Sequence, residues 1–335
     1  MTEPPEALII TRRDIARIMT PADYRNAAEQ AFAAVAAGKA GTPSPMHLPM
    51  TRGGFHAKGA TISTDGEYVA VKVNGNFPGN PAELGLPTIQ GAIVLADGRT
   101  GALLAILDSA EVTLRRTAAA SAVAARLLAR PDSATLLICG CGEQGRAHLA
   151  ALAEVLPVER ALLWDVAVER AGALAAELSG RGIEPAAVHD LRSAARSADV
   201  IVTCTTATKP FLGPDMVNPG TFIAAVGADD PAKHEVAPDL MAASVVVTDS
   251  TAQCAVMGDL HHAIAAGAMT RGDVRAELAD IISGKARPRG SPDETIVFDS
   301  TGTGVQDVAA AAAIYRRCAA AGIGQAVALA ARDQP

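Results

Sequence analysis

The chain has 335 residues, of which 49% are hydrophobic and only 3% aromatic, and its formal net charge is −7. This length allows two domains of ordinary size. With so few aromatic residues, the core must consist largely of Ala, Val, Leu and Ile, a composition that suits helices packed on parallel strands. A net negative charge without any Lys/Arg-rich run predicts that the protein has no nucleic-acid partner. The amino end lacks a secretory leader, and no window is apolar over a membrane's thickness, so we expect a soluble, cytoplasmic protein without a membrane partner.

The five cysteines are scattered and odd in number, which argues against a disulfide framework. Cys139 and Cys141 flank a single glycine, a spacing that could suggest a metal. They lie inside a glycine-rich turn, however, whose neighbours already have a structural role. The seven histidines, including the pair His261 and His262, lack ligand spacing, so we predict no metal site.

The amino-terminal third contains helices followed by short strands. Residues 12–38 predict helices, with Thr20 as a cap-like start before the segment 24–37. Gly, Pro and Asn turns then separate four strand-like runs, at residues 54–62, 68–73, 88–95 and 102–107. These runs predict a mixed or antiparallel sheet in a smaller α+β domain. The Ala-rich helical stretch 110–130 leads into the next domain as a hinge.

Strand and helix signals alternate from residue 134 onward. Strands are expected near residues 134–139, 160–164, 184–188, 199–204, 221–226, 244–248 and 295–298. This alternation is typical of a Rossmann-type doubly wound parallel sheet in an α/β protein. A final helix at 304–320 stands outside the alternation. We therefore predict one domain from 120–303 and another from 1–119 together with 304–335.

A glycine motif follows the first strand of that alternation. The apolar run 134–139 leads into Gly140-x-Gly142-x-x-Gly145, and a helical pattern follows at 146–155. The first glycine permits a sharp turn, the second lets the backbone approach phosphates, and the third lets the helix press against the strand. The alternative is a glycine turn in an ordinary α/β domain. The strand and helix in register favour a dinucleotide site, to which we assign Gly140, Gly142, Glu143, Gln144 and Gly145.

An acidic residue ends the second strand of the same domain. Asp165 follows the apolar run 161–164 and lies 20 residues after Gly145. A carboxylate there accepts hydrogen bonds from the adenosine ribose hydroxyls and repels a 2′-phosphate. We therefore predict NAD as the cofactor in preference to NADP.

Small residues follow three further strands. They are Thr205 and Thr206 after 201–204, Val226 and Gly227 at the end of 221–226, and Ser300 after Phe298. Ligands of open α/β sheets gather at the carboxyl ends of strands, so these residues are candidates for lining the nicotinamide or ribose. Alternatively, the hydroxyls cap helices.

Charged residues at three places in the chain are candidates for binding a substrate or for catalysis. Lys72 lies in a strand pattern and either points to solvent from an edge strand or enters a cleft, where partial burial would depress its pKa. Arg115 and Arg116 face different directions on a helix, so one is solvated and the other could clamp a carboxylate. Asp229 follows the strand 221–226. It could instead form a turn, and Asp230 beside it leaves the choice open.

The chain resembles the ornithine cyclodeaminase/μ-crystallin family over nearly its whole length. The matching motifs, in order, are Val71-Lys-Val73, Asn80-Pro81, Gly85-Leu-Pro-Thr88, Thr100-Gly101, Thr113-Leu-Arg-Arg-Thr-Ala-Ala-Ala-Ser121, Gly140-Cys-Gly-Glu-Gln144, Val226-Gly-Ala-Asp229 and Phe298-Asp-Ser-Thr-Gly302. Members of the family include cyclodeaminases, amino-acid dehydrogenases and ketimine or cyclic-imine reductases. The motifs are therefore more specific for the family than for one activity.

The resemblance implies a homodimer in which 1–119 and 304–335 form the substrate-binding and dimerisation domain. It also implies that Lys72 and Arg116 hold or activate the substrate, that Asp229 is the acid/base, and that Thr88 contacts the substrate. Many relatives carry a carboxylate-binding arginine in the segment matching 44–48, and this chain has none there. Lys58 stands where many relatives have an apolar residue, and it could supply the missing cation.

These features favour an NAD(H)-dependent oxidoreductase that transfers a hydride at the α-carbon of a small amino acid or of its linear or cyclic imine. Arg116, with Lys58 or Lys72, would fix the carboxylate, and Asp229 would exchange a proton with the nitrogen or an attacking water. One alternative is a cyclodeaminase-type lyase, which returns the hydride and releases ammonia. The other is a non-catalytic dinucleotide or small-ligand binder.

Overall fold

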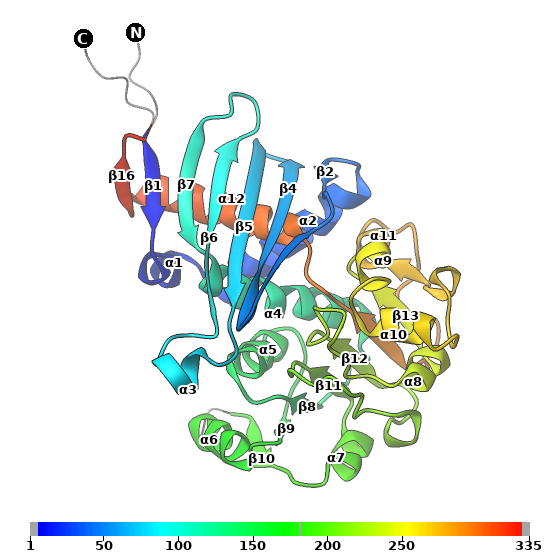
Figure 1. Ribbon diagram of the computed structural model, residues 1–335. Coiled ribbons are helices and arrows are strands. Elements are labelled where there is room, and N and C mark those ends of the chain that lie inside the picture. Colours follow the sequence, from blue (N-terminus) through cyan, green and yellow to red (C-terminus); the bar gives the residue numbers. More distant parts are fainter. Residues whose placement is uncertain (1–5, 181, 330–335) are drawn as a thin grey trace, which may run out of the picture. The chain divides into compact units, whose positions relative to one another are not determined.

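The computed structural model describes residues 6–180 and 182–329. The chain forms two compact units (Figure 1). The first unit comprises Met1–Arg116 and Thr303–Pro335, and the second comprises Thr117–Gly302. Helix α4 (Ser109–Leu128) begins in the first unit and ends in the second.

The first unit is built on an eight-stranded mixed sheet. Its order is β16-β1-β7-β6-β5-β4-β2, and β3 pairs with β4. Strand β1 is parallel to β7 and the other pairs are antiparallel. The strands are β1 (Ala7–Ile10), β2 (Ala40–Gly41), β3 (Met46–Met50), β4 (Gly53–Ser63), β5 (Glu67–Asn76), β6 (Ile89–Asp97), β7 (Leu103–Asp108) and β16 (Gln325–Val327). The helices are α1 (Arg12–Ile18), α2 (Pro21–Ala36), α3 (Asn80–Leu84) and α12 (Gly304–Ala321).

The last helix, α12, packs against this sheet. Figure 1 shows its ribbon running across the strands, and it contacts α2, β4 and β5. Its first residue must be small, because a Cβ on Gly304 would lie 2.5 Å from the carbonyl oxygen of Gly59. The helix therefore approaches the backbone of β4 closely and buries the sheet face that carries Ala60 and Ala70.

Apolar side chains remain exposed on neighbouring strands of this sheet. Val71, Val73 and Val94 are 43%, 43% and 41% exposed. Val71 lies directly opposite Val94 in the β5–β6 register, so the side chains of this pair project from the same face of the sheet. Alternate residues of a strand point to opposite faces, which leaves Ala70 and Lys72 buried on the other side.

The second unit is a parallel sheet in the order β10-β9-β8-β11-β12-β15-β13-β14. Its strands are β8 (Thr135–Cys139), β9 (Arg160–Trp164), β10 (Glu184–Ala187), β11 (Val200–Thr203), β12 (Phe222–Ala225), β13 (Val245–Thr248), β14 (Ala276–Glu277) and β15 (Ile296–Asp299). The chain runs outward from β8 to β10 and then crosses to β11 on the other side of β8. This reversal is the switch point of a doubly wound sheet. The predicted Rossmann-type fold is confirmed.

Helices and short 3-10 turns connect these strands. They are α5 (Glu143–Ala153), α6 (Val168–Leu178), α7 (Leu191–Ser197), η1 (Pro214–Met216), α8 (Pro238–Ala243), α9 (Thr251–Cys254), α10 (Asp259–Ala265), η2 (Arg271–Asp273) and α11 (Leu278–Ile282). Every residue of β11, β12 and β15 is buried. Strands covered on both faces require continuous apolar runs, which is why the sequence pattern identified them.

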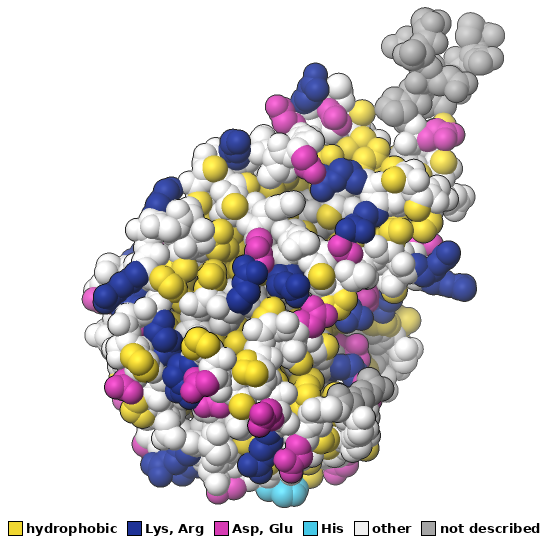
Figure 2. All heavy atoms as spheres, turned by 180° about the vertical axis from the view of Figure 1, so that it is seen from behind, with side chains coloured by type: hydrophobic (Ala, Val, Ile, Leu, Met, Phe, Trp, Pro, Cys, Tyr) yellow, Lys and Arg dark blue, Asp and Glu magenta, His cyan; other side chains and the backbone are white. Residues whose placement is uncertain are grey.

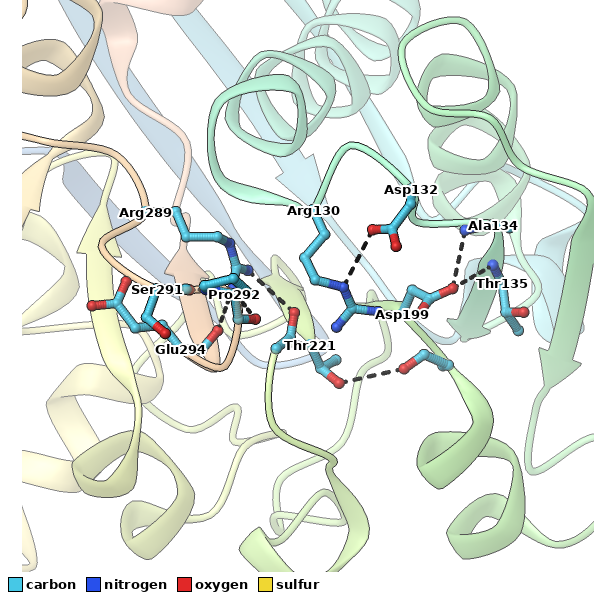
Figure 3. Close-up of polar contacts among 12 residues, drawn as sticks. Arg130, Asp132, Ala134, Thr135, Asp199, Thr221, Arg289, Ser291, Pro292 and Glu294 are labelled. Carbon is cyan, nitrogen blue, oxygen red and sulfur yellow. Dashed lines mark hydrogen bonds and ion pairs between the residues drawn. The ribbon is translucent and has the colours of Figure 1, made fainter.

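Charged side chains tie together the amino edge of this sheet (Figure 3). Asp199 accepts hydrogen bonds from the backbone N–H groups of Ala134 and Thr135, at 3.0 and 2.9 Å, and it pairs with Arg130. Arg289 donates to the carbonyl oxygens of Gly220 and Glu294. These contacts hold the first residues of the strands in place at the amino edge of the sheet, and they lie at the opposite edge from the carboxyl ends of the strands.

The face of the molecule in Figure 2 shows mixed charge. On the face in Figure 2, Lys and Arg side chains are interspersed with Asp and Glu side chains among the residues that are coloured by type. Within residues 6–180 and 182–329, none of the helices combines the length and the apolar character that crossing a bilayer would require.

Candidate functional site

The glycine turn joins β8 to the start of α5. Gly140 has φ +105°, a conformation that side chains disfavour, and a Cβ on it would lie 2.8 Å from the carbonyl oxygen of Cys204. A Cβ on Gly145 would lie 2.1 Å from the carbonyl oxygen of Gly140. No atom lies within 4 Å of the Cβ position at Gly142, the residue before the helix. The turn is therefore compressed at Gly140 and Gly145 and open at the Cβ position of Gly142.

Asp165, which follows β9, stabilises this turn through hydrogen bonds to backbone N–H groups. One carboxylate oxygen accepts a hydrogen bond from the N–H of Cys141 at 2.8 Å, and the other accepts one from the N–H of Ala167 at 2.9 Å. Glu143 instead points outward, with its side chain 76% exposed and paired with Arg146. Burial raises the pKa of Cys141 to about 12, and the charge of Asp165 adds to that effect, so this thiol stays protonated at neutral pH.

A buried glutamate joins two loops at the carboxyl ends of neighbouring strands. Glu235 is 0% exposed. One of its oxygens accepts hydrogen bonds from the N–H and the hydroxyl of Thr205, both at 2.6 Å, and the other accepts one from the N–H of Gly227 at 2.9 Å. Glu235 was not among the predicted site residues, because a single glutamate eight residues after Gly227 matches no known motif.

The other candidate residues at the strand ends differ in their contacts and exposure. Ser300 donates its hydroxyl proton to Asp249 at 3.0 Å, and Val226 is buried. Thr206 is exposed, next to the anchored Thr205. The described residues contain no group of three or more His, Cys, Asp or Glu side chains that could hold a metal ion.

The first unit holds a buried group of three charges. The Lys72 ammonium lies 2.7 Å from one oxygen of Asp307, and Nε of Arg116 lies 2.9 Å from the other. Arg116 also donates to the side-chain oxygen of Gln306 at 3.1 Å, and Lys72 donates to the hydroxyl of Thr113 at 3.3 Å. Lys72, Arg116 and Asp307 are 4%, 5% and 2% exposed. We call these three residues the buried charge triad.

The triad resolves two alternatives left by the sequence. The interpretation of Lys72 as a solvent-facing lysine on an edge strand is wrong, because its side chain is buried and β5 lies between β4 and β6. Arg115 is the solvated arginine, paired with Glu111 one helical turn earlier and 42% exposed. Sequence reasoning missed Asp307. An acid in the first turn of a helix is ordinary in a sequence, because it complements the helix dipole.

Burial sets the electrostatics of the triad. It lowers the pKa of Lys72 to about 8, although the charge of Asp307 opposes this shift. Burial alone would raise the pKa of Asp307, but the Lys72 and Arg116 charges outweigh that effect and hold this pKa below its usual value. Lys72 can therefore gain or lose a proton near neutral pH, while Asp307 remains ionised.

Two further predicted residues lie in the same unit. Lys58 is directly opposite Lys72 in the β4–β5 register, so both side chains project from one face of the sheet. The charge of Lys58 lowers the pKa of both Lys72 and Asp307. Thr88 precedes β6, is half-buried, and accepts a backbone hydrogen bond from Phe77 at 2.9 Å.

The two adjacent aspartates after β12 have different contacts. Asp230 accepts a hydrogen bond from the N–H of Ala232 at 2.9 Å, which is the turn-forming role. Asp229 pairs with the ammonium of Lys233 at 2.5 Å and keeps its side chain 52% exposed. Of the two carboxylates, Asp229 is the one that combines solvent access with a cationic neighbour.

Known proteins share this sequence and fold. The model of the ornithine cyclodeaminase/mu-crystallin family matches residues 6–322. The alanine dehydrogenase of Archaeoglobus fulgidus is 33% identical over 322 residues, which cover 96% of this chain and 98% of the relative. A solved archaeal alanine dehydrogenase dimer with bound NAD has a TM-score of 0.92 at 33% identity, covering 96% of this chain and 99% of its own.

A second solved structure has the same TM-score. It is the Δ1-pyrroline-2-carboxylate reductase of Thermococcus litoralis in complex with NADH and L-proline, with a TM-score of 0.92 at 31% identity, covering 96% of this chain and 100% of its own. The family that the sequence motifs indicated is confirmed, and this chain belongs to the ornithine cyclodeaminase/mu-crystallin family.

Proposed function

We propose that this protein is an NAD(H)-dependent oxidoreductase that transfers a hydride at the α-carbon of a small amino acid or its imine. The observation that carries the proposal is the buried charge triad, which leaves one net positive charge in a site from which water is largely excluded. Such a site suits a substrate carboxylate. The related alanine dehydrogenase and pyrroline-2-carboxylate reductase, with NAD and NADH in their solved structures, support this chemistry.

The glycine turn fits the pyrophosphate of a dinucleotide. Gly142 is the N-cap of α5, where the first N–H groups of a helix have no helical partner, and its Cβ position is open. The carboxylate of Asp165, at the end of β9, would receive the adenosine ribose hydroxyls and exclude a 2′-phosphate, so we propose NAD as the cofactor. Bound NAD supplies the nicotinamide carbon that exchanges the hydride.

The first unit supplies the substrate contacts. Arg116 and Lys72 would hold the carboxylate in the geometry that Asp307 imposes on them, and Thr88 would add a polar contact. Lys58, beside Lys72 in the β4–β5 register, takes the place of the arginine that the segment 44–48 lacks. With a pKa of about 8, Lys72 can also take or return a proton at the substrate. Asp229 would exchange a proton with the substrate nitrogen.

A panel assay tests this proposal. Amino acids are incubated with NAD⁺, and cyclic and linear imines with NADH or NADPH, while nicotinamide absorbance and free ammonia are both recorded. We expect an absorbance change with NADH and a much smaller one with NADPH. Ammonia without net NADH would identify a cyclodeaminase instead. Tight NAD⁺ binding without turnover on any substrate would leave a binding protein.

We also propose that the protein is a homodimer that forms through the exposed apolar face of the first unit's sheet. Val71 and Val94 are cross-strand neighbours on that face, and the solved relative named as a dimer supports this assembly. All five cysteines are free, as is usual for the reducing cytoplasm, where we place the protein.

Val71→Glu is expected to dissociate the dimer, because a carboxylate would be buried against an apolar partner surface. Sedimentation velocity should show twice the chain mass of 34.1 kDa for the wild type and the single-chain mass for the variant. Glu67→Gln, an exposed position on the same strand, is the control and should stay dimeric. A dimeric Val71→Glu protein would exclude this face as the interface.

A further inference from the structure

Glu235 is a buried carboxylate that the proposed chemistry does not use. One of its oxygens accepts hydrogen bonds from the N–H and the hydroxyl of Thr205, and the other accepts one from the N–H of Gly227. Thr205 follows β11 and Gly227 follows β12, and these strands are parallel neighbours. A single side chain therefore fixes the spacing of two loops at the carboxyl edge of the sheet.

The carboxylate packs tightly against one of these loops. A Cβ on Gly227 would lie 2.4 Å from an oxygen of Glu235, so glycine is required for the two to approach this closely. A side chain at residue 227 would push the loop away from its anchor. The short contact and the hydrogen bond together define where the backbone of this loop lies.

Glu235 is itself held from two sides. Its N–H and that of Val236 both donate to one oxygen of Asp259, at 2.9 and 3.0 Å, at the start of α10. Its carbonyl oxygen accepts hydrogen bonds from Phe211 and Leu212, at 3.0 and 3.2 Å. The backbone of Glu235 is therefore a fixed reference point, from which the side chain reaches the two loops.

We infer that Glu235 is a positioning residue for the nicotinamide end of the cofactor; this inference rests on the proposed function. The glycine turn and Asp165 belong to β8 and β9, on one side of the switch point, and Asp165 anchors the turn through Cys141. The loops that Glu235 anchors belong to β11 and β12, on the other side. A dinucleotide spans such a switch point with its adenosine half on one side and its nicotinamide half on the other.

Glu235→Gln separates this role from simple packing. Glutamine keeps the shape of the side chain but replaces one acceptor oxygen with an NH₂ group, which only donates. If its oxygen faces Thr205, the NH₂ group opposes the N–H of Gly227, and the reverse orientation opposes the N–H of Thr205. One of the two loops therefore loses its anchor.

The test compares the binding of NAD⁺ with that of ADP, which contains the adenosine and pyrophosphate but no nicotinamide. Isothermal titration on the full chain should show that the Kd of NAD⁺ rises about tenfold or more in Glu235→Gln. The Kd of ADP should change by less than about twofold, since Asp165 still anchors the glycine turn through the N–H of Cys141. An equal loss for both ligands, or a loss for neither, would overturn the inference.

Asp199→Asn is the matched control. Asp199 also anchors two backbone N–H groups of this sheet, at its amino edge (Figure 3). Its variant should lower the thermal midpoint without changing the ratio of the NAD⁺ and ADP affinities. A similar change in that ratio for Asp199→Asn would mean that general loosening of the sheet is sufficient, which contradicts the inference.

Glu235→Asp provides the same test if the glutamine variant fails to fold. Aspartate keeps the charge and both acceptor oxygens but is one methylene shorter, so it cannot reach both loops, and we expect the same selective loss for NAD⁺. The wild-type titration tests the proposed function by itself. If the wild type binds no NAD⁺, the proposed function and this inference both fail, whereas normal wild-type binding with an unselective variant overturns the inference alone.

Discussion

Asp307→Ala should lower the free energy of unfolding by about 3–5 kcal/mol, because the buried Lys72 and Arg116 lose the carboxylate that they share. Urea denaturation at pH 7 measures the change. Asp65→Ala removes the carboxylate of an exposed pair with Arg316 in the same unit, and it should cost less than about 1 kcal/mol. A loss of similar size in both variants would contradict the importance of the triad.

The same variant should alter acid denaturation. Because the folded protein holds the pKa of Asp307 below its usual value, Asp307 stabilises the fold above the unfolded pKa of about 4, and this contribution disappears as pH falls through the lower folded value. Asp307→Ala lacks this contribution. The difference in stability between the wild type and the variant should therefore shrink as the pH falls below about 4, as urea titrations at several pH values would show. A difference that stays constant with pH would assign the loss to packing alone.

Asp229→Asn should reduce kcat by about 10²–10⁴-fold, because an amide cannot exchange a proton with the substrate nitrogen. The variant keeps the size of the side chain, and Asp229 lies outside the glycine turn, so the Kd of NAD⁺ should stay within about twofold of the wild-type value. Steady-state kinetics in both directions and a binding titration provide the two measurements.

Asp230→Asn is the neighbouring control for that experiment. Asp230 forms the turn through the N–H of Ala232, a bond that the asparagine oxygen can also accept. Its kcat should remain within a few-fold of the wild-type value. If Asp229→Asn is as active as this control, Asp229 has no part in proton transfer.

The sequence predicted the second unit well because its signals are local. The strand 134–139, the glycine turn and the helix after it lie within about twenty residues, and Gly140 and Gly145 each meet a steric demand of the turn itself. Strands buried on both faces also read as continuous apolar runs. The short strands β1, β2, β3, β14 and β16 were not predicted, because two to five residues are too few to give a periodic pattern.

The buried charge triad could not be predicted from local sequence patterns. Asp307 lies 191 residues after Arg116 along the chain, so only the folded sheet with α12 on it brings them together. Lys72 was ambiguous for a different reason. Val71 and Val73 look like the core face of β5 and Lys72 like the exposed one, but the structure reverses this, leaving the valines exposed and the lysine buried. Which face of a strand is covered depends on tertiary packing.

The return of α12 to the first sheet has a consequence for synthesis on the ribosome. The second unit is one continuous stretch and can complete its sheet as soon as residue 302 has emerged. The first unit, although translated earlier, must wait for α12 before Gly304 can pack on β4 and Asp307 can pair with Lys72 and Arg116. The amino-terminal sheet therefore matures after the second unit, and a chain that stops before residue 303 would leave Lys72 and Arg116 without their shared counter-charge.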